Sequence, residues 1–446
     1  ISAYAQDLRS PSMKKFILRH FIAGSLLALL LLIQACAVNP VTGKKELSWM
    51  SEAWELQTGE RYYGFQQQAG GGYYTIDPDL TLYVRSVGKK LIPFSARAHL
   101  PYDFVVLNDS TPNAWALPGG KIAINRGLLI ELDNEAELAA VLAHEIVHAD
   151  ARHSAQSQEV GTIIAGGQVL ATVLLANSDY NHTALQQGVA LTSLYGQTRY
   201  SRSRELESDR YGMQYMREAG YDPRAAISLQ ETFVRLSNSN KAGVFSTLFA
   251  SHPPSQARVD ANRASAAQLP AGGLLNRQRY QQEIAQLIDR QPAYEKADKA
   301  GKAIANKSYR PALGYAQQAI AIEPNESRFF ELKGIALNRL NRAQDALQAY
   351  SRSIALDPNY FSPLLRRGLL KHELKSFSGA ERDLKDSLKL APTQVAYATL
   401  GEIAERKGFG CSQAMGYYQQ AYRAGGSQNQ EIQRKLAALK VSCPAN

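Results

Sequence analysis

The last third of the chain repeats itself with a period of thirty-four residues. A sustained period of this length is typical of arrays of helical hairpins, in which small residues let paired helices approach and prolines end every second helix. Four units are present, and about three suffice to bury a continuous core. The sequence therefore predicts an α-helical solenoid over residues 293–446. The recurring positions are Ala312, Ala346, Ala380 and Ala414, with Pro324, Pro358 and Pro392.

Thirty-four residues is the period of the tetratricopeptide repeat. These repeats hold 23 Lys and Arg against 14 Asp and Glu, and so carry +9 of the chain's net charge of +10. We expect a basic inner surface, including Arg366 and Arg367, that suits acidic partner segments or carboxyl termini. The alternative is that these charges only solvate the helix surfaces. A linker-like sequence, QLPAGG, and a connecting helix are expected over residues 266–292.

The motif HEIVH at residues 144–148 lies in a segment of helical character. Residues 134–153 contain no Gly or Pro, begin with the N-cap candidate Asn134 and place acidic residues in the first turn. On a helix, His144 and His148 stack on one face, where both reach one metal ion, and Glu145 lies beside the metal's open position. This pattern predicts zinc-assisted hydrolysis with Glu145 as the general base.

A catalytic zinc usually takes three protein ligands, so the two histidines need a third. The best candidate is Glu205, in the sequence SRELESDRYG of residues 203–212. Glu205 and Asp209 are four residues apart and share a helix face, so that one carboxylate can bind the metal while the other orients a histidine. A solvated charged helix is the alternative explanation of this segment.

Together these residues resemble the gluzincin metallopeptidases of the CAAX prenyl protease-like group, and within it the bacterial periplasmic members that carry tetratricopeptide repeats. Further matching segments are NPVTG at 39–43, NAWALPGG at 113–120 and SHPPS at 251–255, followed by Arg258. The resemblance implies a mostly α fold. An α+β zincin-like domain, helical with a small β-sheet, is expected over residues 37–265, ahead of the solenoid.

The resemblance also implies a ligand set. One Zn²⁺ ion per chain is expected to be bound by His144, His148 and Glu205, with Glu145 as the base and Asp209 supporting the site.

Three more residues match the family. The resemblance adds His252 as a fourth ligand, which occupies the water position and holds the enzyme at rest; a loop histidine without a ligand role is the alternative. It places Arg258 near the oxyanion, with an ordinary salt bridge as the alternative. For His153 we expect a structural hydrogen bond.

Residues 103–108 and 114–117 are predicted to be short strands, and a turn at 118–120 leads into a third strand at 121–125. The free edge of this hairpin suits pairing with the backbone of an extended substrate, which reads side chains only loosely. An ordinary internal hairpin is the alternative. The edge residues we expect are Asn113, Ala114, Trp115 and Ala116.

The first part of the chain, residues 1–36, resembles an upstream extension followed by a bacterial lipoprotein signal. Basic residues precede thirteen uncharged residues, 21–33, and a small residue stands before Cys36. Lipidation of Cys36 would anchor the protein to a membrane facing the periplasm. Because Ala37 is not the aspartate associated with retention at the inner membrane, we expect the outer membrane.

Two further expectations concern burial and pairing. The apolar segment 160–176 is expected to be a buried or lid-forming helix, with membrane insertion as the alternative. Cys411 and Cys443 are an even pair in an oxidising compartment, and we expect a disulfide between them; pairing with another protein or buried thiols are the alternatives. Nucleic acid is excluded as a partner, because the signal points out of the cytoplasm and no basic, aromatic platform is present.

The function implied by the resemblance is a membrane-anchored periplasmic zinc endopeptidase that degrades misfolded or stalled outer-membrane proteins. Its repeat domain would bind partners, among them the beta-barrel assembly machinery. The alternatives are a chaperone-like outer-membrane assembly factor whose peptidase is rarely active, and a general periplasmic scavenging protease.

Overall fold

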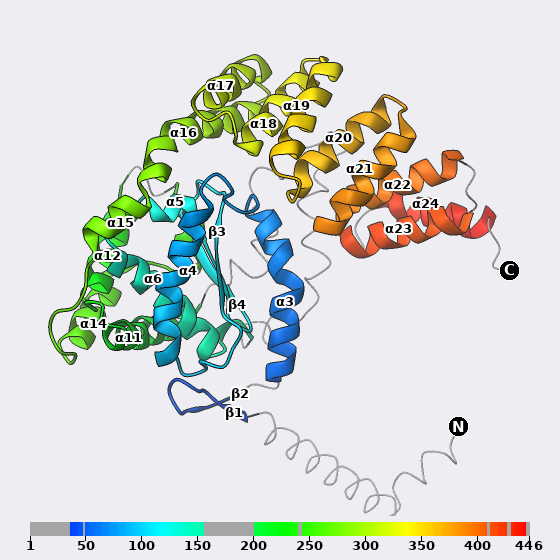
Figure 1. Ribbon diagram of the computed structural model, residues 1–446. Helices are drawn as coiled ribbons and strands as arrows, with labels where there is room; N and C mark the ends of the chain where they lie inside the picture. Colours follow the sequence, from blue (N-terminus) through cyan, green and yellow to red (C-terminus); the bar gives the residue numbers. More distant parts are fainter. Residues whose placement is uncertain are drawn as a thin grey trace, which may run out of the picture.

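The computed structural model describes residues 36–47, 50–155, 200–239, 243–407, 411–425 and 430–442. Within these ranges an α+β domain is followed by an arc of paired helices (Figure 1). The predicted fold class, mostly helical with a small sheet and a solenoid, is confirmed. The signal segment, the apolar segment 160–176 and Cys443 lie outside the described residues, as do the side chains of Cys36 and Cys411. Among the helices in these ranges, none combines the length and the apolar character needed to cross a membrane.

A three-stranded sheet lies at the centre of the first domain. Its order is β3-β5-β4, with β3 parallel to β5 and β4 antiparallel to β5. The predicted strands and the turn between the last two are confirmed, and Gly119 and Gly120 in that turn have φ of 79° and 81°, a region that favours glycine. The strands are β3 (Asp103–Leu107), β4 (Ala114–Leu117) and β5 (Lys121–Asn125).

Helices cover both faces of this sheet. Because side chains alternate along a strand, Val105 and Trp115 pack with Tyr63 of α3 (Glu52–Ala69), whereas Val106 and Ala116 belong to the cluster formed with α4 (Pro78–Leu91) and α6 (Glu135–Asp150). The other elements of the domain are β1 (Cys36–Val38), β2 (Lys45–Leu47), η1 (Ile92–Phe94), α5 (Arg126–Leu129), α11 (Arg202–Glu218), α12 (Ala225–Ser237), α13 (Ser246–Ser251) and α14 (Gln256–Ala266).

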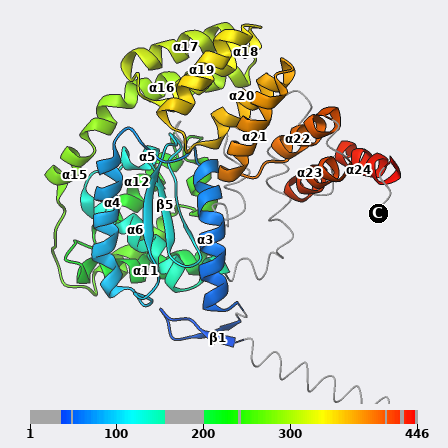
Figure 2. The ribbon, with the colours of Figure 1, turned by 45° about the vertical axis from the view of Figure 1, so that its right-hand side comes forward.

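The remaining helices form the solenoid, which curves over the first domain (Figure 2). They pack in successive pairs, and a Cβ atom at Gly334 would lie 2.5 Å from Cε1 of Tyr350, so the close approach within one pair requires glycine. The boundary expected at residue 293 falls inside α16. The helices are α15 (Arg277–Glu283), α16 (Ala285–Ala305), α17 (Tyr309–Ile322), α18 (Ser327–Arg339), α19 (Ala343–Leu356), α20 (Phe361–Glu373), α21 (Phe377–Leu390), α22 (Gln394–Lys407), α23 (Cys411–Gly425) and α24 (Gln430–Ser442).

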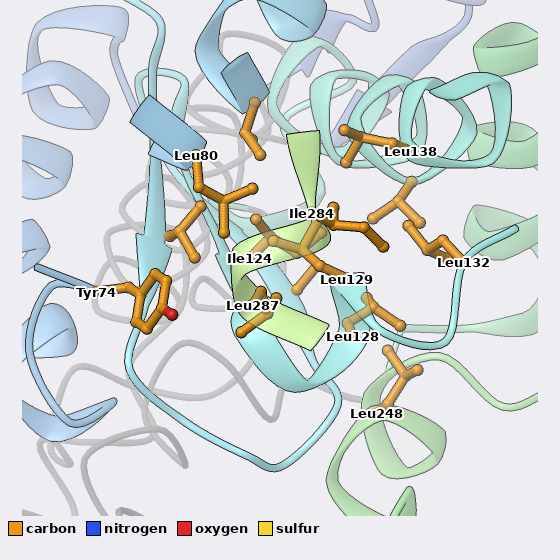
Figure 3. Packing of buried hydrophobic residues seen from close by; sticks show 14 of the residues in the cluster. Tyr74, Leu80, Ile124, Leu128, Leu129, Leu132, Leu138, Leu248, Ile284 and Leu287 are labelled. Carbon is orange, nitrogen blue, oxygen red and sulfur yellow. The ribbon is translucent and has the colours of Figure 1, made fainter. Parts of the chain in front are cut away.

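The solenoid is joined to the first domain by a shared core and by buried hydrogen bonds. One hydrophobic cluster contains Ile124 of β5, Leu138 of α6 and Leu287 of α16 (Figure 3). The side-chain amide of Gln68 on α3 donates to the carbonyl oxygen of Asn359 at 2.8 Å and accepts from the backbone N–H of Phe361 at 2.9 Å. The two regions are therefore held in one arrangement.

The expectation for Arg366 on an exposed basic surface is wrong. Its side chain is buried, and Nε donates to Oε1 of Glu331 at 2.7 Å. Arg367 is partly buried and also forms an ion pair. Its Nε and Nη2 each lie 2.7 Å from a carboxylate oxygen of Asp383. Each guanidinium pairs with a carboxylate on a neighbouring helix, and Asp383 also pairs with Lys371. The charge count does not reveal these pairings.

Candidate metal centre

Helix α6 places two imidazoles on one face. It begins as predicted, since the Asn134 side chain accepts a hydrogen bond from the backbone N–H of Glu137 at 3.0 Å. One turn apart near its other end, His144 and His148 direct their Nε2 atoms toward each other, 3.0 Å apart. His148 is fully buried, so its ring is held by the packing around it.

Helix α11 brings a carboxylate to these rings. It packs directly on α6, where a Cβ atom at Gly212 would lie only 3.3 Å from the backbone nitrogen of His144. In this arrangement Glu205 Oε1 lies 3.3 Å from Nε2 of His148, and Oε2 lies 3.6 Å from Nε2 of His144. The third predicted ligand therefore lies beside the first two.

The residue after α13 completes the group. His252 Nδ1 lies 3.2 Å from Nε2 of His144 and 3.2 Å from Oε1 of Glu205. The candidate ligand atoms of all four residues lie within 4.8 Å of one another, and all four are largely buried. Three imidazole nitrogens and one carboxylate are a donor set that suits Zn²⁺, and buried acceptor atoms this close favour a shared cation.

Asp209 and Arg258 form a support around this group. Asp209 Oδ1 lies 2.9 Å from Nδ1 of His144, the nitrogen that faces away from the candidate ligand atoms. Arg258 donates to both carboxylate oxygens of Asp209, and its Nη1 lies 2.8 Å from Oε2 of Glu205. Arg258 thus forms ion pairs with two carboxylates, which agrees with the alternative of a salt bridge rather than with a position at the oxyanion.

Glu145 lies next to the group without joining it. Its Oε1 is 3.5 Å from Nε2 of His252, whereas its Oε2 is buried without a hydrogen-bond partner among the described residues. Burial raises the pKa of Glu145. A buried carboxylate with one uncommitted oxygen is suited to accept a proton from a reactant.

Charge pairing sets the direction of the pKa shifts of His144 and Glu205, whereas burial holds the pKa of His148 well below its usual range. Burial alone would lower the pKa of His144, but the carboxylates of Glu205 and Asp209 outweigh it and raise that pKa to about 10. Burial would raise the pKa of Glu205, yet His252 and His144 hold it well below its usual range. The carboxylates of Glu205 and Asp209 therefore favour positive charge at the imidazoles, while Arg258 balances part of their negative charge from the other side.

A cavity of about 40 Å³ adjoins His144 and Glu145. Its wall is mostly apolar and includes Ala114 of the edge strand β4. Besides Glu145, it contains two buried polar atoms without hydrogen-bond partners among the described residues, Oγ of Ser208 and Oε1 of Gln230. Such a volume holds a few water molecules or a small side chain.

Two residues that touch the site, Tyr200 and Gln230, carry no signal in the sequence. Tyr200 stacks on the ring of His148, with centroids 3.9 Å apart and planes 21° from parallel. No local pattern marks Tyr200, because its contact arises from the packing of α11 on α6. Gln230 was missed for the same reason, since it reaches the cavity from α12. His153 was expected to make a structural hydrogen bond, and its Nδ1 lies 2.9 Å from Nδ1 of His148.

Comparisons with known proteins agree with this geometry. Residues 78–266 match Peptidase family M48. The "Putative beta-barrel assembly-enhancing protease" of Vibrio cholerae is 33% identical over 203 residues, which cover 44% of this chain and 40% of the relative. The "Beta-barrel assembly-enhancing protease" of Escherichia coli (strain K12) is 31% identical over 196 residues, covering 43% of this chain and 40% of the relative.

Other matches extend the comparison. The "Mitochondrial metalloendopeptidase OMA1" of Schizosaccharomyces pombe is 36% identical over 181 residues, 40% of this chain and 51% of the relative. A solved structure of MamA from Desulfovibrio magneticus RS-1 covers 34% of this chain and 84% of its own, with 22% identity and a TM-score of 0.31. The match spans about two fifths of the length of the bacterial relatives.

Proposed function

We propose that this chain, whose residues 78–266 match Peptidase family M48, is a zinc-dependent endopeptidase. The observation that carries the proposal is the position of Glu145, a base with one uncommitted oxygen, against four residues that share a metal-sized centre. His144, His148, Glu205 and His252 would hold the metal. When bound, zinc supplies Lewis acidity, which acidifies water and polarises a carbonyl group.

The protein's own groups account for the proton transfers. Glu145 Oε2 takes a proton from the attacking water, and the same carboxyl group returns it to the amine that leaves when the peptide bond breaks. Burial raises the pKa of Glu145, which strengthens its carboxylate as a base. Arg258 and Asp209 hold the ligand carboxylate and His144 in place.

Strand β4 is the sheet edge that would pair with the substrate backbone. Ala114 and Ala116 are only 1% and 2% exposed, so this edge must be uncovered before a peptide pairs with it. The backbone N–H of Asn125 donates to the carbonyl of Asn113, so Trp115 and Leu117 also face β5, and Ala114 and Ala116 present their backbone groups to the outer edge. The Ser154 hydroxyl donates to the carbonyl of Ala116 at 3.2 Å. An extended peptide paired to the rest of this edge would lie beside the cavity that Ala114 lines.

His252 supports a resting state. With three other ligands, it would fill a tetrahedral zinc and leave no position for water. Activity then requires His252 to leave, which limits cleavage to the moments when a substrate or partner displaces it. The same closed set supports the second candidate function, an assembly factor whose peptidase is rarely active.

The location and clients follow from the relatives and from the signal-like segment at residues 1–36. Two bacterial relatives are named beta-barrel assembly-enhancing proteases. The proposed setting is the periplasm, with the lipid on Cys36 at the outer membrane, and the proposed clients are stalled outer-membrane proteins.

The test compares wild type with Glu145→Gln, because glutamine keeps the shape of the side chain but cannot accept the proton. Wild type should bind one zinc per chain and cleave unfolded casein, whereas Glu145→Gln should bind the same zinc and lose at least about 100-fold in rate. Equal rates would reject the assignment of the base. In cells, outer-membrane barrels trapped by Glu145→Gln would support the clients, and a broad periplasmic sample would indicate scavenging.

A further inference from the structure

We propose that Asn39, Glu207 and His153 form a hydrogen-bonded chain that positions the metal ligand His148, so that the amino-terminal hairpin is part of the metal centre. This inference rests on the metal site of the proposed function. It assigns a role to the NPVTG segment at residues 39–43, which the catalytic geometry alone does not use.

The chain of contacts begins at the side of His148 that faces away from the ligand group. His148 Nδ1 lies 2.9 Å from Nδ1 of His153, a side chain that is only 1% exposed. His153 Nε2 lies 3.4 Å from Oε1 of Glu207 on α11. Glu207 Oε1 in turn accepts a hydrogen bond from Nδ2 of Asn39 at 3.0 Å.

These contacts allow one consistent set of proton positions. A neutral His148 that offers Nε2 to a metal carries its proton on Nδ1, and among the described residues that proton faces Nδ1 of His153. His153 then carries its own proton on Nε2, facing the Glu207 carboxylate. His144 reaches its carboxylate, Asp209, directly, whereas His148 reaches a carboxylate through a second imidazole. Such carboxylate-to-histidine contacts fix the orientation of a ligand ring.

The hairpin turn fixes the direction in which Asn39 donates. Its Oδ1 accepts from the backbone N–H groups of Val41 at 2.9 Å and Thr42 at 3.2 Å. Its Nδ2 must therefore face the carboxylates, Glu207 at 3.0 Å and Glu46 at 3.3 Å. The side chain is 2% exposed. An aspartate would keep the turn but place a third carboxylate against the other two, so asparagine suits both tasks.

The same hydrogen bonds could serve only to hold the hairpin against α11. The test must therefore measure metal affinity and metal geometry as well as stability. Full-length protein is prepared as Asn39→Asp, Glu207→Gln and the control Glu46→Gln, which changes the other carboxylate on Asn39. The Zn²⁺ dissociation constant, from competition with a chelator, should rise about 10- to 100-fold in the first two variants and less than about twofold in the control. The visible spectrum of the Co²⁺-loaded protein should change in the same two.

Rescue at His153 gives a second measurement. Asparagine keeps an acceptor near the position of Nδ1, so His153→Asn should bind zinc more tightly than His153→Leu. If the metal-free melting temperature falls in the variants while the dissociation constant and the spectrum stay at wild-type values, the chain is only structural and the inference is overturned. If neither wild type nor His252→Ala cleaves any substrate although both bind zinc, the proposed function alone is rejected; a wild type that binds no zinc would reject both.

Discussion

Arg258 donates two hydrogen bonds to Asp209, from Nε to Oδ2 at 2.8 Å and from Nη2 to Oδ1 at 2.7 Å. Oδ1 of Asp209 also contacts Nδ1 of His144. Through this pair the guanidinium orients His144, a proposed metal ligand that it does not touch. This arrangement favours a positioning role for Arg258, which acts through Asp209, over a direct role at the reacting atoms.

Arg258→Lys should weaken metal binding. Lysine cannot reproduce the bidentate contact with Asp209 together with the contact to Glu205, so His144 and Glu205 are held less firmly. We expect the zinc dissociation constant to rise about tenfold and the melting temperature to fall. Arg263→Lys, an exposed arginine on the same helix, is the control and should change neither. Full zinc affinity and stability combined with a lost rate would instead place Arg258 at the oxyanion.

His252→Ala should still bind zinc through three ligands and should cleave unfolded casein faster than wild type. The reason is that removing the fourth ligand opens the position that water needs. Initial rates are compared at equal zinc content, and self-cleavage is followed by mass spectrometry. A slower variant with full zinc would recast His252 as a residue that assists the reaction.

Glu135 should give the protein a pH-dependent stability. Burial would raise its pKa, but hydrogen bonds from Asn276, Tyr221 and Tyr83, with the charge of Arg279, lower it below 4.5. A lowered pKa stabilises the folded state above 4.5, and this contribution disappears as the pH falls through the folded value. Glu135→Gln should therefore cost about 1–3 kcal/mol at neutral pH.

Chemical denaturation from about pH 7 down to about pH 3.5 measures this difference, which should shrink only below 4.5. Glu283→Gln is the matched control, because Glu283 contacts the same Arg279 from the surface. A difference between wild type and Glu135→Gln that stays constant across the range would contradict the assignment.

Arg366→Glu should unfold part of the solenoid. The substitution would bury a second carboxylate against Glu331 and remove its partner, at a cost of about 3–5 kcal/mol. Thermal unfolding followed by circular dichroism checks the loss. The exposed Arg382 is the control, and Arg382→Glu should leave the melting temperature within a few degrees. An unchanged melting temperature in Arg366→Glu would restore the expectation of a surface role.

The sequence predicted those parts of the site that local spacing determines. A four-residue separation on a helix is enough to place His144 beside His148, and the period of the repeats is enough to identify the solenoid. The environments of Arg258 and Arg366 were not predictable, because each depends on a carboxylate from another helix. The contact between Asn39 and Glu207 joins residues 168 positions apart and leaves no local pattern.

The hydrophobic cluster that runs from β5 through α6 into α16 has a consequence for how this protein evolved. Two domains that contact each other only through their surfaces can be exchanged independently during evolution. Here the solenoid's first helices contribute Tyr280, Leu287 and Tyr294 to the interior that also packs behind α6. A change of repeat at this point would require new side chains under α6, so the first domain and the first helices of the solenoid are expected to be inherited together.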